Sequence, residues 1–239
     1  MSGPARPRVA VVLFPGSNCD HDAVHAVETA MEGEARLVWH AGTDLGDPDL
    51  VILPGGFSYG DYLRCGALAR FSPVMDAVRD FAAKGGAVLG ICNGFQVLCE
   101  AGLLPGALLL NSGQRFLCQD VNVRIESTRT PFTSYLAKGN VLRLPIAHGD
   151  GNWRAEPATF EEVVANDQVV FRYCDEAGER TPGSNPNGSL DDVAGVCNRE
   201  RNVVGLMPHP ERAAEGILGN ADGARLLRSF SATLLDRTA

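Results

Sequence analysis

One cysteine of the chain stands where a nucleophile would be expected. Cys92 directly follows the apolar run Ala87–Ile91, and the pattern after it becomes helical. Gly90 and Gly94 flank it, and glycines remove Cβ atoms that would crowd a tight turn between a strand and a helix. The N–H groups at the start of the helix favour the thiolate, the nucleophilic form. The stretch predicts covalent catalysis by Cys92; the alternative is a buried core cysteine, the usual state of a free thiol.

A nucleophilic cysteine needs a base, and His209 is the best candidate among five histidines. It follows the apolar run Val203–Met207 and lies between two prolines, which restrict the backbone. Glu211 comes two residues later, and in an extended segment its carboxylate would point the same way as the imidazole. We therefore predict a triad of Cys92, His209 and Glu211. His148 ends another apolar run and is expected to line the site rather than act as the base.

A glycine-rich turn, Pro54-Gly-Gly-Phe57, follows the apolar run Asp49–Leu53. Attack on a carbonyl produces an oxyanion, which two backbone N–H groups commonly stabilise. Asn93, directly after the cysteine, could supply one N–H group, and a glycine of this turn could supply the other. A phosphate-binding loop is not predicted, because no Gly-Lys-Ser/Thr follows. An ordinary turn between a strand and a helix is the alternative for this segment.

The elements that must hold these residues alternate between strand and helix in the first half of the chain. Their short connections favour a parallel sheet covered on both faces. The predicted strands are Val9–Phe14, Arg36–His40, Asp49–Leu53 and Ala87–Ile91. The predicted helices are Cys19–Gly33, Pro73–Lys84, with Ser72 as its N-terminal cap, and Asn93–Ala101.

The second half has strand patterns with few helices between them, which predicts an antiparallel segment of the sheet. The strands are Asp120–Glu126, Val141–Ile146, Gln168–Tyr173, Ala194–Asn198 and the buried Val203–Met207, followed by a closing helix over Asp222–Asp236. Residues 177–189 are rich in Gly, Pro, Asn and Ser and are expected to form a loop. We expect one α/β domain over residues 1–239, with residues 1–7 as a loose tail.

Composition limits the classes of function. The chain has 239 residues, 45% of them apolar, and a net charge of −8, which argues against a nucleic-acid or anionic membrane surface. No apolar run approaches the roughly 20 residues that span a bilayer. The seven cysteines are irregularly spaced and include no Cys-x-x-Cys pair, so neither structural zinc nor a disulfide framework is predicted. A reducing cytoplasm is the expected location.

With these residues assembled, the chain resembles the class I, triad-type glutamine amidotransferases. Longer strings resemble the glutaminases of phosphoribosylformylglycinamidine synthase. This resemblance implies a flavodoxin-like fold. The strings are Pro15–Asp20, Pro54–Gly66, Cys92–Gln96, Ala147–Asn152, Asn185–Ser189 and Met207–Arg212. Asp150 departs from the pattern, since similar sequences often have Glu there.

The resemblance implies hydrolysis of L-glutamine to glutamate and ammonia. The ammonia would pass to a separate ATP- and Mg²⁺-dependent synthetase subunit, bridged by a small third subunit, with no cofactor or metal in this chain. It implies Cys92 as nucleophile, His209 as base and acid, and Glu211 as its orienting partner. Gly56 and Asn93 would form the oxyanion hole, and the expected glutamine-binding residues are Gly55, Phe57, Gln96, His148 and Gly149.

Two other classes of function stay open at this stage. A stand-alone cysteine hydrolase or peptidase of related fold would share the triad but need no partner subunit. A catalytically silent binding protein could use Cys92 as a redox sensor, although a sensor has no need of the Pro-His-Pro-Glu segment. For the glutaminase we expect low activity without partners, because an oxyanion loop rich in glycine can stay unformed until a partner docks.

Overall fold

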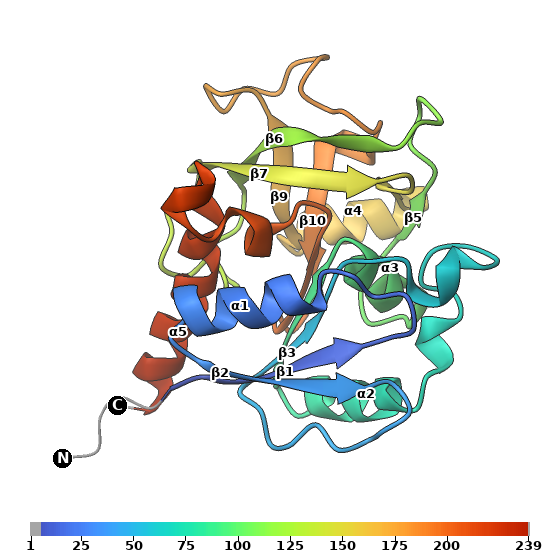
Figure 1. Ribbon diagram of the computed structural model, residues 1–239. Helices are drawn as coiled ribbons and strands as arrows, with labels where there is room; N and C mark the ends of the chain where they lie inside the picture. The colour runs from blue at the N-terminus through green and yellow to red at the C-terminus, as the bar shows by residue number, and fades with distance from the viewer. Residues whose placement is uncertain (1–5, 239) are drawn as a thin grey trace.

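The computed structural model describes residues 6–238 and contains one large mixed sheet with helices on both faces (Figure 1). The nine strands of this sheet lie in the order β2-β1-β3-β4-β11-β10-β9-β6-β7. They are β1 (Arg8–Leu13), β2 (Glu34–Trp39), β3 (Leu50–Leu53), β4 (Ala87–Ile91), β6 (Leu117–Ile125), β7 (Val141–His148), β9 (Val169–Cys174), β10 (Val193–Cys197) and β11 (Val203–Leu206). The helices are α1 (Asp20–Ala30), α2 (Val74–Ala83), α3 (Asn93–Glu100), α4 (Pro157–Ala165) and α5 (Asp222–Thr238).

The first five strands of that order are all parallel, as predicted for the first half of the chain. Every residue of β3, β4 and β11 is buried, which explains their continuous apolar sequences. The crossover through α1 runs along the sheet in the opposite direction to the crossover through α2. Because such crossovers are right-handed, these two helices cover opposite faces. The α/β fold class predicted from the sequence is confirmed.

The remaining strands, β10, β9, β6 and β7, are joined by antiparallel pairings, so the predicted antiparallel segment is present. Two short strands and one α-helix of this half were not predicted from the sequence. Strands β5 (Ala107–Leu109) and β8 (Asn152–Arg154) form a separate two-stranded sheet, and each has only three residues. Helix α4 buries one residue, Val163, and therefore has almost no apolar stripe to reveal it.

Two local predictions need correction. The predicted helix Cys19–Gly33 is shorter and covers Asp20–Ala30. Ser72 does not cap α2, whose N-cap position is Pro73, because the Ser72 hydroxyl lies 2.9 Å from the Tyr59 hydroxyl and hydrogen-bonds to it instead.

At the N-terminus, residues 1–5 of the predicted loose tail lie outside the described residues. Pro7 is buried, and its carbonyl accepts a hydrogen bond from the N–H of Glu34. None of the helices in residues 6–238 is long and apolar enough to span a bilayer.

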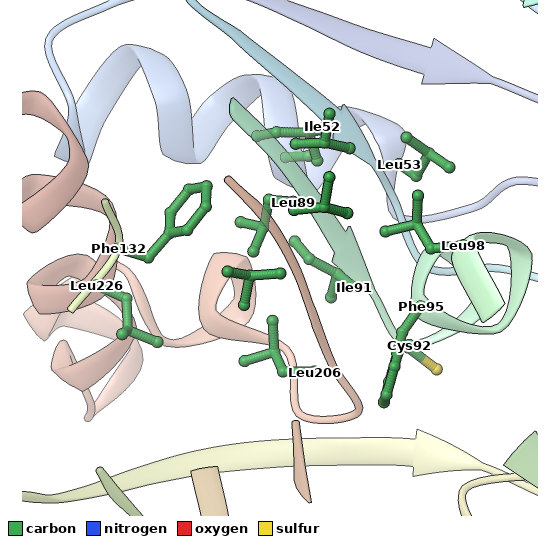
Figure 2. Close-up of a cluster of buried hydrophobic side chains, with 14 of the residues drawn as sticks. Ile52, Leu53, Leu89, Ile91, Cys92, Phe95, Leu98, Phe132, Leu206 and Leu226 are labelled. Atoms are coloured by element: carbon green, nitrogen blue, oxygen red, sulfur yellow. The ribbon is translucent and has the colours of Figure 1, made fainter. Parts of the chain in front are cut away.

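The core continues up to the candidate nucleophile. In Figure 2 Cys92 lies at one edge of this buried cluster, beside Phe95, directly after the end of β4, and its sulfur points away from the other labelled side chains. Close packing of this kind fixes the strand ends, and with them the turns that carry polar groups.

Candidate active site

Cys92 occupies a strained turn between β4 and α3. Its backbone has φ 50° and ψ −105°, a conformation that costs a residue with a Cβ about 1–3 kcal/mol. The turn is held by a hydrogen bond of 2.8 Å from the Cys92 N–H to the carbonyl of Leu206 in β11. Helix α3 begins at the next residue, Asn93, so its unpaired N–H groups lie close to the sulfur. The strand, turn and helix predicted from the sequence are all present.

The flanking glycines are required by close contacts. A Cβ on Gly94 would lie 1.9 Å from the carbonyl oxygen of Leu53 in β3. A Cβ on Gly90 would lie 2.8 Å from the carbonyl group of Gly94 and 2.5 Å from the side chain of Leu98. All three distances are shorter than real Cβ contacts, so α3 can approach the sheet this closely only with glycine at these positions.

His209 and Glu211 are joined by a hydrogen bond of 2.6 Å between Nδ1 and Oε1. Both side chains are buried, with exposed fractions of 2% and 1%. The contact between the two side chains was predicted correctly. The predicted extended backbone was wrong, because Pro210–Ala213 forms a turn of 3₁₀ helix. The N–H of His209 donates to the carbonyl of Pro145 in β7 over 2.8 Å, which fixes the histidine from the antiparallel side of the sheet.

The electrostatic environment favours a charged His209. Burial by itself lowers the pKa of this imidazole, but the Glu211 carboxylate and the Cys92 thiolate together hold its pKa well above the ordinary value. Nδ1–H donates to Glu211, so Nε2 is the nitrogen that gains or loses the titrating proton, and it has no hydrogen-bond partner within residues 6–238. A histidine in this state can accept a thiol proton at Nε2 and return it.

The Pro54-Gly-Gly-Phe57 turn packs between His209 and the segment around Ser17. A Cβ on Gly55 would lie 2.7 Å from Cε1 of His209. Gly56 has φ 148° and pairs with Ser17 in an isolated antiparallel bridge, where a Cβ would lie 2.7 Å from the Ser17 Cα. Gly55 is therefore required by the His209 ring and Gly56 by the backbone around Ser17, and both lie on the loop beside the imidazole.

Gln96 lies inside the protein, with both ends of its amide engaged. Its Nε2 donates to the carbonyl of Asp150 over 2.7 Å, and its Oε1 accepts from Asn93 Nδ2 over 2.8 Å. The Asn93 side chain in turn accepts a hydrogen bond of 3.1 Å from the N–H of Ser58. This network connects α3 to the loops after β3 and β7.

His148 is buried at the end of β7. Asn111 donates two hydrogen bonds through Nδ2 to backbone carbonyls, so its Oδ1 accepts a hydrogen bond of 3.1 Å from Nδ1–H of His148. His148 Nε2 is then an acceptor, and it has no partner within the described part of the chain. Burial, reinforced by the positive charge of His209, lowers the pKa of His148 to about 4, so the ring is neutral. The next residue, Gly149, accepts a hydrogen bond from the Asn111 N–H through its carbonyl.

A cavity of about 190 Å³ opens beside His209. Phe57 and Phe116 both line it, and their rings stack with centroids 6.4 Å apart. Ala147 also lines the cavity, and its carbonyl oxygen lies 3.7 Å from the Cys92 sulfur. The lining residues are Asn18, Cys19, Gly56, Phe57, Phe116, Ala147, His209 and Arg212.

Five of these lining residues were not predicted as site residues from the sequence: Asn18, Cys19, Phe116, Ala147 and Arg212. Cys19 lies in the Pro15–Asp20 string, so its position could have been flagged, but its contact with His209 depends on the fold. Asn18, Ala147 and Arg212 also lie in strings that carry the family resemblance, whereas Phe116 lies in none of them.

The arrangement provides every group that acyl transfer from an amide requires. It has a thiol at a helix N-terminus, an imidazole with a free nitrogen, a carboxylate that orients the imidazole, and a glycine turn that presents backbone N–H groups.

Comparison with known proteins supports this chemistry. Residues 6–225 match the family model of the CobB/CobQ-like glutamine amidotransferase domain. The phosphoribosylformylglycinamidine synthase subunit PurQ of Thermomicrobium roseum is 58% identical over 222 residues, covering 93% of this chain and 94% of that protein. The corresponding subunit of Moorella thermoacetica is 54% identical over 223 residues, covering 93% of this chain and 94% of that protein.

Solved structures agree with these relatives. A chain in the structure of PurLQS from Thermotoga maritima superposes with a TM-score of 0.85 at 44% identity, covering 96% of this chain and 99% of that one. A glutamine amidotransferase from the same organism has a TM-score of 0.55 at 16% identity, covering 98% of this chain and 86% of that one, and shares the fold.

Proposed function

Because the chain belongs to the family of the PurQ subunits of phosphoribosylformylglycinamidine synthase, we propose that it is the glutaminase subunit of such an enzyme. It hydrolyses L-glutamine to glutamate and ammonia for the synthesis of formylglycinamidine ribonucleotide in purine biosynthesis. The observation that carries this assignment is the strained Cys92 turn, packed on the same sheet edge as the buried His209–Glu211 pair.

The reaction begins with transfer of the Cys92 thiol proton to Nε2 of His209. The thiolate attacks the side-chain amide carbon of glutamine, and the oxyanion that forms is stabilised by the N–H groups of Gly56 and Asn93. His209 then protonates the leaving nitrogen, the carbon–nitrogen bond breaks, and ammonia and a γ-glutamyl thioester result. Water, deprotonated by His209, attacks the thioester, and glutamate leaves as the thiol is restored.

The substrate is held by the walls around this centre. Gly55 and Phe57 belong to the glycine turn, and Gln96 fixes the first turn of α3 through its amide hydrogen bonds. His148 and Gly149 lie at the end of β7, where the neutral His148 Nε2 offers a buried acceptor to a substrate N–H group. Phe57 and Phe116 cover the cavity and limit the entry of water.

The ammonia is used by a second protein. The names of the relatives and the PurLQS complex support a separate synthetase subunit and a small bridging subunit as partners of this chain. In this proposal the synthetase subunit binds and uses ATP and Mg²⁺. The assembled enzyme works in the cytoplasm.

The test measures glutamate release from glutamine by the wild type and Cys92→Ser, each alone and with both partner subunits, formylglycinamide ribonucleotide and ATP. We expect release that requires Cys92, is low for the isolated chain and rises when the partners are added. Equal release with and without partners would remove the pathway assignment and leave a cysteine hydrolase. No release in any mixture, with partners that are active on ammonia, would reject the glutaminase.

A further inference from the structure

A second thiol lies beside the triad histidine. Cys19 is the N-cap residue of α1, and its N–H donates to the carbonyl of Gly55 over 3.2 Å. Cys19, His209 and Glu211 each have one possible metal-ligand atom in a cluster whose three atoms lie within 4.8 Å of one another. The catalytic mechanism uses only Cys92 as a thiol, so the reaction does not explain a buried Cys19 at this position.

His209 and Glu211 each have one buried polar atom without a hydrogen-bond partner. Nε2 of His209 and Oε2 of Glu211 have no hydrogen bond to any part of residues 6–238. Both side chains are almost completely inaccessible, with exposed fractions of 2% and 1%. A buried polar atom without a partner costs about 1–3 kcal/mol, so a ligand that binds it recovers a penalty already present in the fold.

The surroundings allow an ion to reach and remain at this cluster. Cys19 and His209 both line the cavity of about 190 Å³, which gives a route of entry. Asn18 lines the same cavity, and its Oδ1 lies 3.2 Å from the Cys19 sulfur, where it adds an oxygen donor. Zn²⁺ binds cysteine as the thiolate, and one thiolate with one carboxylate neutralises a divalent cation.

We propose that Cys19, His209 and Glu211 form a binding site for a thiophilic divalent cation of the Zn²⁺ class. Thiolate, imidazole and carboxylate are the three donor types that Zn²⁺ prefers, and Asn18 or water completes four-coordination. Donors about 2.0–2.3 Å from one ion lie roughly 3.3–3.8 Å apart in a tetrahedral site. The three groups therefore need to rearrange by less than about 1.5 Å from their present separations.

We expect the bound ion to inhibit the enzyme. This inhibition rests on the proposed function, whereas the binding of the ion is independent of the proposed function. Coordination through Nε2 of His209 removes the lone pair that accepts the thiol proton. Coordination through Nδ1 replaces its hydrogen bond to Glu211. Either arrangement stops proton transfer, so the ion and the reaction compete for one imidazole.

The test titrates the full chain with Co²⁺ as a spectroscopic substitute for Zn²⁺, followed by displacement with Zn²⁺. We expect the charge-transfer absorption of a Co²⁺–thiolate bond in the wild type and in Cys92→Ala. Cys19→Ser should lose this band and bind Zn²⁺ at least about tenfold more weakly, since even groups that only support a ligand contribute ten- to hundredfold. Cys118→Ser is the matched control, because Cys118 is exposed in β6, and it should behave as the wild type.

A second measurement on the wild type avoids dependence on the folding of any variant. Zn²⁺ should slow alkylation of Cys19 by iodoacetamide, measured by peptide mass spectrometry, and leave Cys118 unaffected. A band that disappears in Cys92→Ala but persists in Cys19→Ser would overturn the proposal, as would the absence of any thiolate band together with unchanged alkylation of Cys19. If the binding is present but the isolated chain proves not to be a glutaminase, the metal site stands without its inhibitory role.

Discussion

The two halves of the sheet contribute to the site in different ways. In the parallel half, the groups that we propose to react lie directly after strands, and the backbone there is strained or depends on glycine, as at Cys92, Gly56 and Gly94. In the antiparallel half, the contribution comes from strand backbone and buried polar side chains. Pro145 and Ala147 of β7 direct carbonyl groups at His209 and Cys92, and His148 is fixed by Asn111.

This difference teaches that chemistry and positioning are separable in this fold. Turns at the carboxyl ends of parallel strands bring a thiol, an imidazole and N–H groups to one edge of the sheet. The antiparallel strands then close that edge and hold the imidazole in place. Substitutions in the parallel half should therefore abolish the reaction, and those in the antiparallel half should alter binding, pH dependence or stability.

The largest effect is expected from Cys92→Ser. We expect glutamine-dependent turnover of the assembled enzyme to fall by about 10⁴-fold or more, because a triad nucleophile has no substitute. The ammonia-dependent reaction should remain, since it needs only the partner subunits in contact with this chain. Both rates are measured on the same preparation, and loss of the ammonia-dependent rate as well would indicate a structural role for Cys92.

Glu211→Gln should have the second largest effect, a fall in glutaminase activity of about 10³- to 10⁴-fold, as found when a triad carboxylate becomes an amide. Glu211 raises the pKa of His209, so protonation of His209 stabilises the folded wild type. This contribution is complete below the unfolded pKa of about 6.5 and disappears as pH rises through the raised folded pKa. The variant's deficit in free energy of unfolding, measured by urea titration, should therefore shrink at alkaline pH; a constant deficit would contradict the pKa direction.

Gly94→Ala tests whether the turn needs its close backbone contact. Its Cβ would lie 1.9 Å from the Leu53 carbonyl oxygen, so we expect a loss of about 3 kcal/mol or more in the free energy of unfolding. Gly113→Ala is the control, because nothing lies within 4 Å of a Cβ there. Equal stability of the two variants would show that α3 packs less tightly against the sheet than described.

His148→Gln should have the smallest effect near neutral pH. Because burial first, and then the charge of His209, lower the pKa of His148 to about 4, its protonation favours the unfolded chain. Stability should therefore fall as pH drops from about 6.5 toward 4, by at most about 1.4 kcal/mol per pH unit. The variant should lose this part of the acid dependence in urea titrations. An unchanged acid dependence would show that His148 is not the buried neutral group described.

The parallel half could be predicted well from the sequence because its strands, turns and helices are each marked by residues that are adjacent in the chain. A buried strand, a cysteine between glycines and a helical pattern occupy consecutive residues, and their bounds agree with β4 and α3. The Pro-His-Pro-Glu segment likewise keeps both members of the His209–Glu211 pair within two residues. Spacing alone could not show that a 3₁₀ turn, rather than an extended segment, brings them together.

The contacts that could not be predicted join residues far apart in the chain. Asn111 and His148 are 37 residues apart, and the hydrogen bond between them depends on the loops around the ends of β6 and β7. Cys19 and His209 meet only because the loops after β1, β3 and β11 converge at one edge of the sheet. Ser72 shows the same limit on a small scale, since its hydroxyl binds Tyr59 rather than the helix it precedes. Such contacts are set by packing and leave no periodic signal in the sequence.

The most direct test of the central claim is to find the covalent intermediate. The assembled enzyme is mixed with labelled glutamine, quenched in acid during turnover, digested and examined by mass spectrometry. We predict a single γ-glutamyl adduct on the peptide that contains Cys92, absent in Cys92→Ser. A γ-glutamyl adduct on Cys19 instead, or turnover in the wild type with no adduct on Cys92 when the quench captures other thioesters under the same conditions, would contradict the account.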